Sequence, residues 1–309
     1  MITRPQAIGT AVVVGVLTLV PAFVPGYFTS LATLMLIYAM LAMSVDLLAG
    51  YAGRTPLCHG AIFGAASYVV MYVVTTAGGN PWLAMPLGLL AAVAVAAVFA
   101  ALAVRTSGVY FLLLTLALGM IVWGVVQRWT SVTGGENGLR GNARPELLAD
   151  QNVFYYFVLV VGLAAAALMW RLVRSPFGLA LKGIRESESR MRSLGYHTTR
   201  HLFLAFLFSG AMAGLAGVLY AWFNSFVSPS TVALTQSVKG LLMVIVGGVG
   251  TLFGGVVGAA VIIVLENVVS SFTERWSMVL GGLFVLTMIF APEGIVGKLR
   301  SYLARRRSR

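Results

Sequence analysis

The chain of 309 residues is 59% apolar, and only 10% of its residues are charged, against about 25% in a soluble domain. Charged side chains are absent from four long stretches, 5–45, 55–104, 201–238 and 240–265. Such continuous apolar runs exclude a soluble globular protein and favour membrane helices over an alternating β-barrel. Most of the cations behind the net charge of +12 lie beside the apolar runs, at 171–200 and 298–309, which excludes a nucleic-acid partner.

Proline, glycine and charge divide the first half of the chain into six expected membrane helices, each about the 20 residues that a bilayer core requires. They are 6–24, 27–49, 57–77, 81–104, 110–127 and 154–173. An even number of crossings places the N-terminus on the side of the basic segment, which the positive-inside rule makes cytoplasmic. The loop 128–152 is then external, and its three arginines are balanced by three acids.

Three apolar stretches follow the basic segment, at 202–224, 231–266 and 277–291. Because both basic clusters should be cytoplasmic, 231–266 must cross the membrane twice or not at all. A glycine-rich centre at 247–250 allows the chain to turn there, so the stretch forms either two short spans or a re-entrant hairpin. We expect two spans, and hence an all-α polytopic protein of about ten transmembrane helices with both termini cytoplasmic.

The polar segment 174–201 interrupts the apolar pattern and shows helical order of its own. Pro176 suits a first helical turn, apolar residues follow at helical spacing, and Gly195 can end a helix. A loop of this length with internal helices is unusual for a plain connector. The segment is either a solvated cytoplasmic loop or, as we favour, a docking platform for a soluble partner.

Four blocks of sequence, in order along residues 50–297, carry a resemblance to a known family. They are GYAGRTPLCHGAIFGAASY at 50–68, GVYFLLLTLALGMIVWGVVQRWTSVTGGENGL at 108–139, SPFGLALKGIRESESRMRSLGYHTTRHLFLAFLFSGAMAGLAGVLYA at 175–221 and PEGIVG at 292–297. The blocks resemble the permease subunits of branched-chain amino acid ABC importers, and the LivM-like subunit more than its LivH-like partner.

The resemblance implies a single permease domain over 1–309 with the fold of type II ABC importers, in a bacterial cytoplasmic (inner) membrane. It implies as partners, besides membrane lipid, a LivH-like second permease subunit, two cytoplasmic ATPase subunits and an external solute-binding protein. The ATPase-coupling role would fall on Gly183, Ile184, Arg185, Glu186, Ser187, Glu188 and Gly195. The sequence departs from the general ABC-permease signature at 189–191, where Ser-Arg-Met replaces Glu-Ala-Ala, and from the first block at 54–58.

The chain carries no sequence for hydrolysing ATP. A P-loop ends in Gly-Lys-Ser/Thr, and Gly297-Lys298 is followed here by Leu299. We therefore expect a non-enzymatic chain whose ATP is hydrolysed by separate subunits. The single cysteine, Cys58, excludes an internal disulfide, and His59 has no second ligand at metal-binding spacing, so no metal or cofactor is expected.

Polar residues within or beside the spans are pathway or gating candidates by default. They are Asp46, Arg54, His59 and Thr115. An anchoring role for Asp46 with Arg54 is equally compatible with the sequence, and Thr115 could instead bond its own helix. Lys239 is expected to snorkel outward along its stem, and Glu266 to mark an outer helix end.

The main alternative function is an ion-coupled secondary transporter, which needs a titratable group or an unwound helix near the midplane. Only Lys239 and Asp46 are candidates for that group. A membrane-embedded enzyme would need paired carboxylates or a His/Asp/Glu cluster, which the sequence lacks. The sequence leaves the substrate open among branched-chain and other amino acids, amides, urea and aromatic acids.

Overall fold

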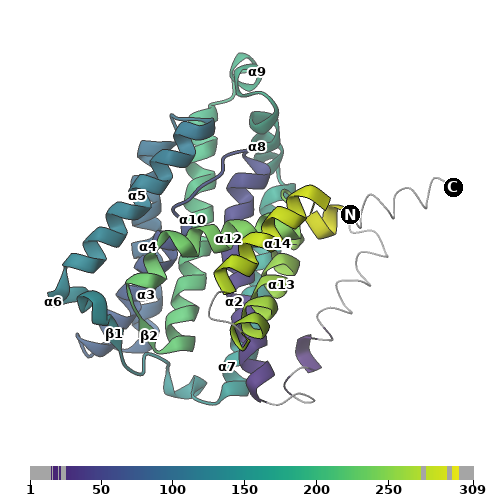
Figure 1. Ribbon diagram of the computed structural model, residues 1–309. Helices are drawn as coiled ribbons and strands as arrows, with labels where there is room; N and C mark the ends of the chain where they lie inside the picture. The colour runs from purple at the N-terminus through teal and green to yellow at the C-terminus, as the bar shows by residue number, and fades with distance from the viewer. Residues whose placement is uncertain are drawn as a thin grey trace.

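The computed structural model describes residues 26–272, 276–290 and 294–298, together with residues 15, 17–19 and 21. These residues form a bundle of helices with one short two-stranded sheet (Figure 1). Most of the first expected span, 6–24, and of the basic C-terminal tail lies outside the described residues.

The first helices follow the predicted punctuation. Helix α2 (Gly26–Asp46) continues into a wider π-helical turn, η1 (Leu47–Tyr51). After a non-helical loop come α3 (His59–Thr75), α4 (Pro81–Ala103) and α5 (Gly108–Arg128). Asn80 begins α4, since its side chain accepts a hydrogen bond from the Trp82 amide at 2.9 Å.

The loop after α5 contains several short elements and half of the sheet. They are α6 (Thr130–Thr133), η2 (Gly135–Asn137), β1 (Leu139–Arg140) and η3 (Glu146–Leu148). Strand β1 pairs antiparallel with β2 (Phe226–Val227), so that Leu139 lies opposite Val227. This pairing ties the loop to the chain that leaves α10.

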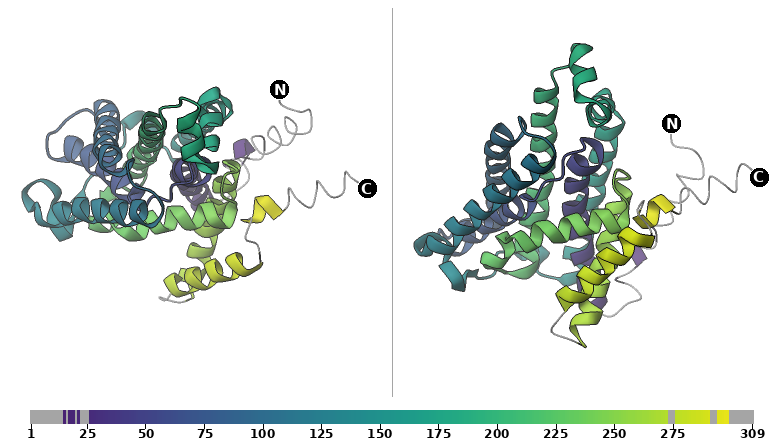
Figure 2. Two further views of the ribbon diagram at one scale, coloured as in Figure 1. Left: turned by 90° about the horizontal axis from the view of Figure 1, so that it is seen from above. Right: turned by 45° about the horizontal axis from the view of Figure 1, so that its top comes forward.

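Helix α7 (Gln151–Arg174) leads into α8 (Pro176–Glu186) and α9 (Glu188–Ser193), and α10 (Thr198–Asn224) returns through the bundle. Figures 1 and 2 show α8 and α9 at one end of the bundle and α6, β1 and β2 at the other. The basic segment and the neutral loop 128–152 therefore lie at opposite ends.

The stretch 231–266 contains two helices joined by a turn. After α11 (Pro229–Val232), α12 (Leu234–Gly247) lies across the bundle (Figure 1), and α13 (Phe253–Ser270) and α14 (Trp276–Phe290) follow it. With 14 residues, α12 is about 21 Å long, which is shorter than a bilayer core of about 30 Å.

Six helical segments within the described part of the chain are long and apolar enough to cross a membrane, with α3 and α12 as shorter apolar helices. The six are Gly26–Tyr51, Pro81–Ala103, Gly108–Arg128, Gln151–Arg174, Thr198–Asn224 and Phe253–Ser270. The protein is thus an all-α polytopic membrane protein, as predicted, but these helices alone do not reach the predicted ten spans.

Small residues bring α10 close to its neighbours. A Cβ at Gly210 would lie 2.2 Å from the Cβ of Ala96 in α4. A Cβ at Gly214 would lie 2.2 Å from the Cβ of Ala92, also in α4. On the adjoining face, a Cβ at Gly217 would come within 2.1 Å of the Phe63 carbonyl oxygen of α3. These glycines let the helix backbones touch, the usual basis of packing in lipid.

Candidate functional site

Segment 174–201 folds into two short helices whose ends follow from the local sequence. Pro176 occupies the first turn of α8, where a backbone N–H would have no acceptor within the helix, so the N–H that proline lacks is not needed there. Ser187 is extended between α8 and α9, and its hydroxyl accepts a hydrogen bond from the Arg190 amide at 3.4 Å. Gly195 follows α9 with a φ of +85°, a left-handed conformation that suits glycine.

Helix α8 turns one face into the protein and the other outward. The buried residues are Gly178, Ala180, Leu181 and Ile184. On the outer side of α8, Leu179 is 71% exposed and Glu186 is also exposed, and Leu194, which follows α9, is 67% exposed. Gly183 lets α9 fold back on α8, since a Cβ there would lie 2.7 Å from Met191 Sδ.

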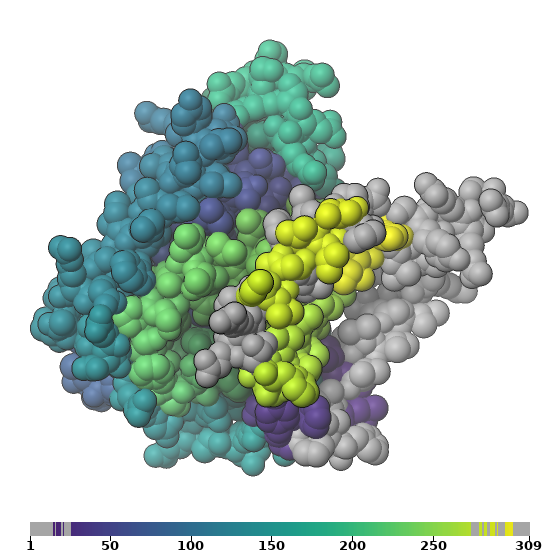
Figure 3. Space-filling view, viewed as in Figure 1, coloured from purple at the N-terminus to yellow at the C-terminus, as the bar shows by residue number. Residues whose placement is uncertain are grey.

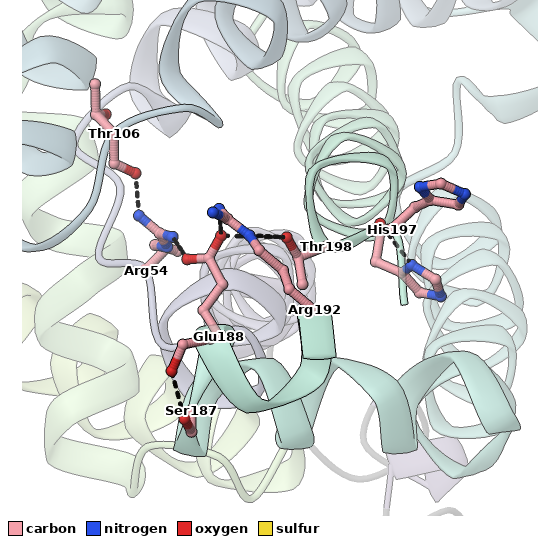
Figure 4. A network of polar contacts seen from close by, with 9 residues as sticks. Arg54, Thr106, Ser187, Glu188, Arg192, His197 and Thr198 are labelled. Carbon is pink, nitrogen blue, oxygen red and sulfur yellow. Dashed lines mark hydrogen bonds and ion pairs between the residues drawn. The ribbon is translucent and has the colours of Figure 1, made fainter. Parts of the chain in front are cut away.

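Glu188, the first residue of α9, is the centre of a polar network (Figure 4). Its Oε2 pairs with Arg54 Nη2 at 2.5 Å, and its Oε1 pairs with Arg192 and accepts from the Thr198 hydroxyl at 3.2 Å. Arg54 also donates to the carbonyl of Thr106, between α4 and α5. The network fastens α9 to the loop after η1, to the α4–α5 connection and to the start of α10.

Arg54 is only 8% exposed, although it carries a charge. Burial lowers the pKa of its guanidinium, and the carboxylate of Glu188 opposes that shift. The guanidinium carbon also lies 5.9 Å from the ring centroid of Phe111. Because its carboxylate partner belongs to α9, a displacement of α9 would leave a buried cation uncompensated. The loop that carries Arg54 is therefore sensitive to the position of α9.

Helix α8 rests on η1 and the residues that follow it. Arg185 donates from Nη1 to the Gly50 carbonyl. Its stem lies against Gly53, which has a φ of +68° and where a Cβ would come within 2.7 Å of Arg185 Cγ. Lys182 places its Nζ 5.3 Å from the ring centroid of Tyr51. A π-helical turn such as η1 often occurs at a functional site.

Asp46, at the end of α2, holds the turn between α12 and α13. Its Oδ1 accepts from the Gly250 amide at 2.6 Å and its Oδ2 from the Leu252 amide at 2.9 Å, and its side chain is fully buried. Leu252 has a φ of +56°, which is strained for a residue with a branched side chain. A Cβ at Gly50 would lie 2.4 Å from the Gly250 nitrogen, so η1 also touches this turn.

Residues 46–54 thus lie between the docked segment and the α12–α13 turn. Arg185 and Glu188 contact them from one side, and Gly250 contacts them from the other. Asp46 and Arg54 have different partners, and the anchoring or gating role expected for them stays a prediction. We call residues 46–54 the linking segment.

His59 and Thr115 connect helices rather than face open space, since both are fully buried. His59 Nε2 lies 2.6 Å from the hydroxyl of Ser209, which donates to the Ser44 carbonyl at 2.6 Å. The Thr115 hydroxyl donates to the Leu112 carbonyl of its own helix and accepts from the Leu57 amide at 3.1 Å. These contacts tie α3, α10, α2 and α5 together near the linking segment.

Lys239 and Glu266 form an ion pair with each other, a contact that we did not predict. The Lys239 side chain therefore binds Glu266 instead of extending outward without a partner. Glu266 likewise has a binding partner and does not only lie near a helix end. The available signal was the placement of two opposite charges on either side of the charge-free run 240–265. Elsewhere in the described chain, no three His, Cys, Asp or Glu side chains gather in a group that could hold a metal ion.

Taken together, the apolar bundle and its docked polar segment define a polytopic membrane protein of the transporter type. Residues 27–288 match the family described as the branched-chain amino acid transport system permease component, and the chain belongs to this family.

Individual relatives agree with this membership. The chain is 30% identical to the high-affinity branched-chain amino acid transport system permease protein LivM of Salmonella typhimurium, over 88% of this chain and 71% of the relative. It is 26% identical to the corresponding LivH protein of Escherichia coli, over 84% and 91%. The predicted resemblance to this family is confirmed. No solved structure matches the chain.

Proposed function

We propose that the chain is a LivM-like permease subunit of an ATP-driven importer for a branched-chain amino acid or a related small polar solute. The observation that carries the proposal is the docked segment α8–α9. Its inner side is fastened to the linking segment by Arg185 and Glu188, and its outer side exposes Leu179, Glu186 and Leu194. The relatives LivM and LivH, which are named as branched-chain amino acid transport permeases, support the substrate class.

The proposal includes the ten-span fold of type II importers in a bacterial cytoplasmic membrane, with 6–24 supplying the first crossing and both termini cytoplasmic. Seven Lys and Arg residues lie at 171–200, next to α8 and α9, whereas the loop 128–152 is electrically neutral. The positive-inside rule then supports a cytoplasmic α8–α9 and an external 128–152.

The other subunits of the importer follow from this arrangement. A LivH-like permease would pair with this chain and complete a path between the two, and two cytoplasmic ATPase subunits would bind the α8–α9 ends. An external solute-binding protein would deliver the solute near 128–152. Because Gly297-Lys298-Leu299 is no P-loop, this chain itself would hydrolyse no ATP.

The contacts also suggest how ATPase motion would travel. A push on α8 would move Arg185 and, through its bond to Gly50, the linking segment. The linking segment would pass the displacement to the α12–α13 turn through the hydrogen bonds that the Gly250 and Leu252 amides donate to Asp46. Packed elements that shift together can carry such coupling over a distance.

An ion-coupled secondary transporter is the second candidate, and the Lys239–Glu266 pair favours it, since such transporters place titratable groups within the membrane. The two functions differ in their energy source. Leucine uptake that collapses on ATP depletion but survives loss of the proton gradient supports the importer. The opposite pattern supports the secondary transporter.

The direct test is reconstitution of the chain with the LivH-like subunit, the ATPases and the solute-binding protein in vesicles. ATP-driven uptake of radiolabelled leucine is the expected result. Glu186→Arg and Gly195→Asp should each reduce co-purification of the ATPases or coupled uptake at least fivefold.

Glu146→Arg is the matched control, because it makes the same charge change at an exposed residue of η3, at the opposite end of the bundle. It should leave ATPase binding unchanged. If both coupling variants behave like this control, α8–α9 is not the ATPase docking segment.

A further inference from the structure

The ion pair between Lys239 of α12 and Glu266 of α13 has further polar neighbours. Lys239 Nζ lies 4.3 Å from the ring centroid of Tyr38 in α2. One turn earlier, the Gln236 amide donates to the Tyr38 hydroxyl at 3.0 Å, and that hydroxyl lies 3.3 Å from Gln236 Oε1. We call these residues, with Tyr220 beside Tyr38, the α12–α13 polar cluster.

Contacts other than the ion pair also hold α12 against α13. Near the turn, the two helices already touch through their backbones. A Cβ at Gly258 would lie 1.8 Å from the Met243 carbonyl oxygen. A Cβ at Gly247 would lie 1.8 Å from the Gly254 carbonyl oxygen. A buried ion pair adds little net stability, since removing two charges from water costs about as much as their attraction returns.

The pair is also not sealed inside the protein. The side chains of Lys239 and Glu266 are 12% and 22% exposed, whereas Tyr38 beneath them is 3% exposed. Figure 3 shows α12 at the surface, between α5 and α14. Charged side chains within a membrane protein rarely face lipid and usually face the bundle interior or a water-filled cavity. A partly exposed ion pair in such a protein is therefore a candidate for contact with a polar solute.

We propose that the α12–α13 polar cluster is a binding site for the zwitterionic head of an α-amino acid on its way through the importer. The amino acid would exchange ions with the pair, so that its carboxylate binds Lys239 and its ammonium binds Glu266. The Tyr38 and Gln236 groups would supply hydrogen bonds beside the exchanged charges. This inference rests on the proposed function and adds to it the residues that recognise the substrate.

The charge balance explains why a zwitterion fits and simpler ions do not. Before and after the exchange, each charge has one opposite partner, and the net charge of the site stays zero. A ligand with only a carboxylate would leave Glu266 without a cation, and a ligand with only an ammonium would leave Lys239 without an anion. An uncompensated charge in an apolar surrounding is strongly disfavoured.

The test uses the reconstituted importer with radiolabelled leucine and three double variants. Lys239→Met/Glu266→Met and Lys239→Gln/Glu266→Gln remove both charges and leave no unpaired ion. Lys239→Glu/Glu266→Lys keeps the pair but exchanges its two ends, so a substrate would have to bind in the reverse orientation. Each variant is expected to assemble, to keep basal ATP hydrolysis within twofold of the wild type, and to lose at least tenfold in leucine uptake.

Lys239→Arg/Glu266→Asp is the control that keeps both charges in place, and it should retain more than a third of wild-type uptake. Near-normal uptake by an assembled neutral variant, or full restoration by the exchanged pair, would overturn the site and leave the permease assignment intact. Failure of both neutral variants to assemble would also overturn it, since the pair would then serve folding. A wild-type importer without ATP-driven uptake would instead overturn the proposed function.

Discussion

Both ends of the bundle have side-chain contacts between elements, but among the described residues only the end opposite α8–α9 adds backbone strand pairing. At the α8–α9 end, charged side chains from one element bind another element, as Arg54 binds Glu188 and Arg185 binds the Gly50 carbonyl. At the opposite end, strands β1 and β2 pair through their backbones, and Arg144 donates to the Trp222 and Phe223 carbonyls at 3.1 and 3.3 Å. Glycines with positive φ at 134, 135 and 138 shape the loop there.

This difference indicates where the molecule can move. Side-chain contacts between separate elements can break and form again as rigid helices shift, whereas a backbone-paired loop keeps one geometry. We therefore expect changes at the α8–α9 end to alter the coupling between ATP hydrolysis and transport. Changes at the other end should alter stability and leave that coupling as it is.

The largest effect is expected for Asp46→Ala. The substitution leaves the Gly250 and Leu252 amides without their acceptor, at about 1–3 kcal/mol for each buried group. Leucine transported per ATP hydrolysed should fall at least tenfold. Asp150→Ala is the matched control, because Asp150 also accepts from two amides, but at the start of α7. It should lower stability by about 1 kcal/mol and leave the ratio unchanged.

Glu188→Gln should have the next largest effect. It removes the charge that compensates Arg54 and weakens bonds worth about 2 kcal/mol. The importer should lose about three- to tenfold in transport per ATP. In a double-mutant cycle with Arg54→Gln, the two effects should be clearly less than additive. Glu186→Gln, at an exposed residue of the neighbouring helix, is the control for stability and should change it by less than 0.5 kcal/mol.

Arg144→Gln tests the other end. The side chain donates to two carbonyls of α10, and its guanidinium lies 4.2 Å from the ring centroid of Phe154. Loss of these contacts should cost about 1–2 kcal/mol of stability, measured as a lower melting temperature of the purified complex. Transport per ATP should stay within twofold of the wild type. A large fall in that ratio would contradict the proposed division between the two ends.

A small effect on coupling is expected from one of a pair of glycine substitutions. Gly53 and Gly78 both have left-handed backbones, with φ of +68° and +63°, so alanine costs about 1–2 kcal/mol at either position. Only at Gly53 would the new Cβ meet another side chain, that of Arg185. Gly53→Ala should therefore reduce transport per ATP by about two- to threefold, and Gly78→Ala should not. Equal ratios would show that Arg185 does not act through Gly53.

Much of the fold could be predicted because its boundaries are local. The expected spans 57–77, 81–104 and 154–173 correspond to helices 59–75, 81–103 and 151–174. Pro, Gly and Asn at the breaks act on the adjacent backbone, so a single sequence is enough to place them. The division of 231–266 into two helices could also be predicted, because glycines at its centre allow the chain to turn there.

The partners of the polar residues could not be predicted in the same way. Asp46 binds residues more than 200 positions away, and His59 binds Ser209, because the fold brings these helices together. Apolar patterns specify that a helix is buried but not which neighbour it meets. Lys239 and Glu266 were visible as charges beside apolar runs, but only the antiparallel course of α12 and α13 makes them a pair.

Hydrogen–deuterium exchange of the reconstituted importer, with and without its ATPase subunits, shows whether α8–α9 binds the ATPases and is linked to the α12–α13 turn. Binding of the ATPases should protect 176–195 and change exchange at the linking segment and at 248–252, while 128–152 exchanges as before. Protection of 128–152, or unchanged exchange over 176–195, would contradict this arrangement.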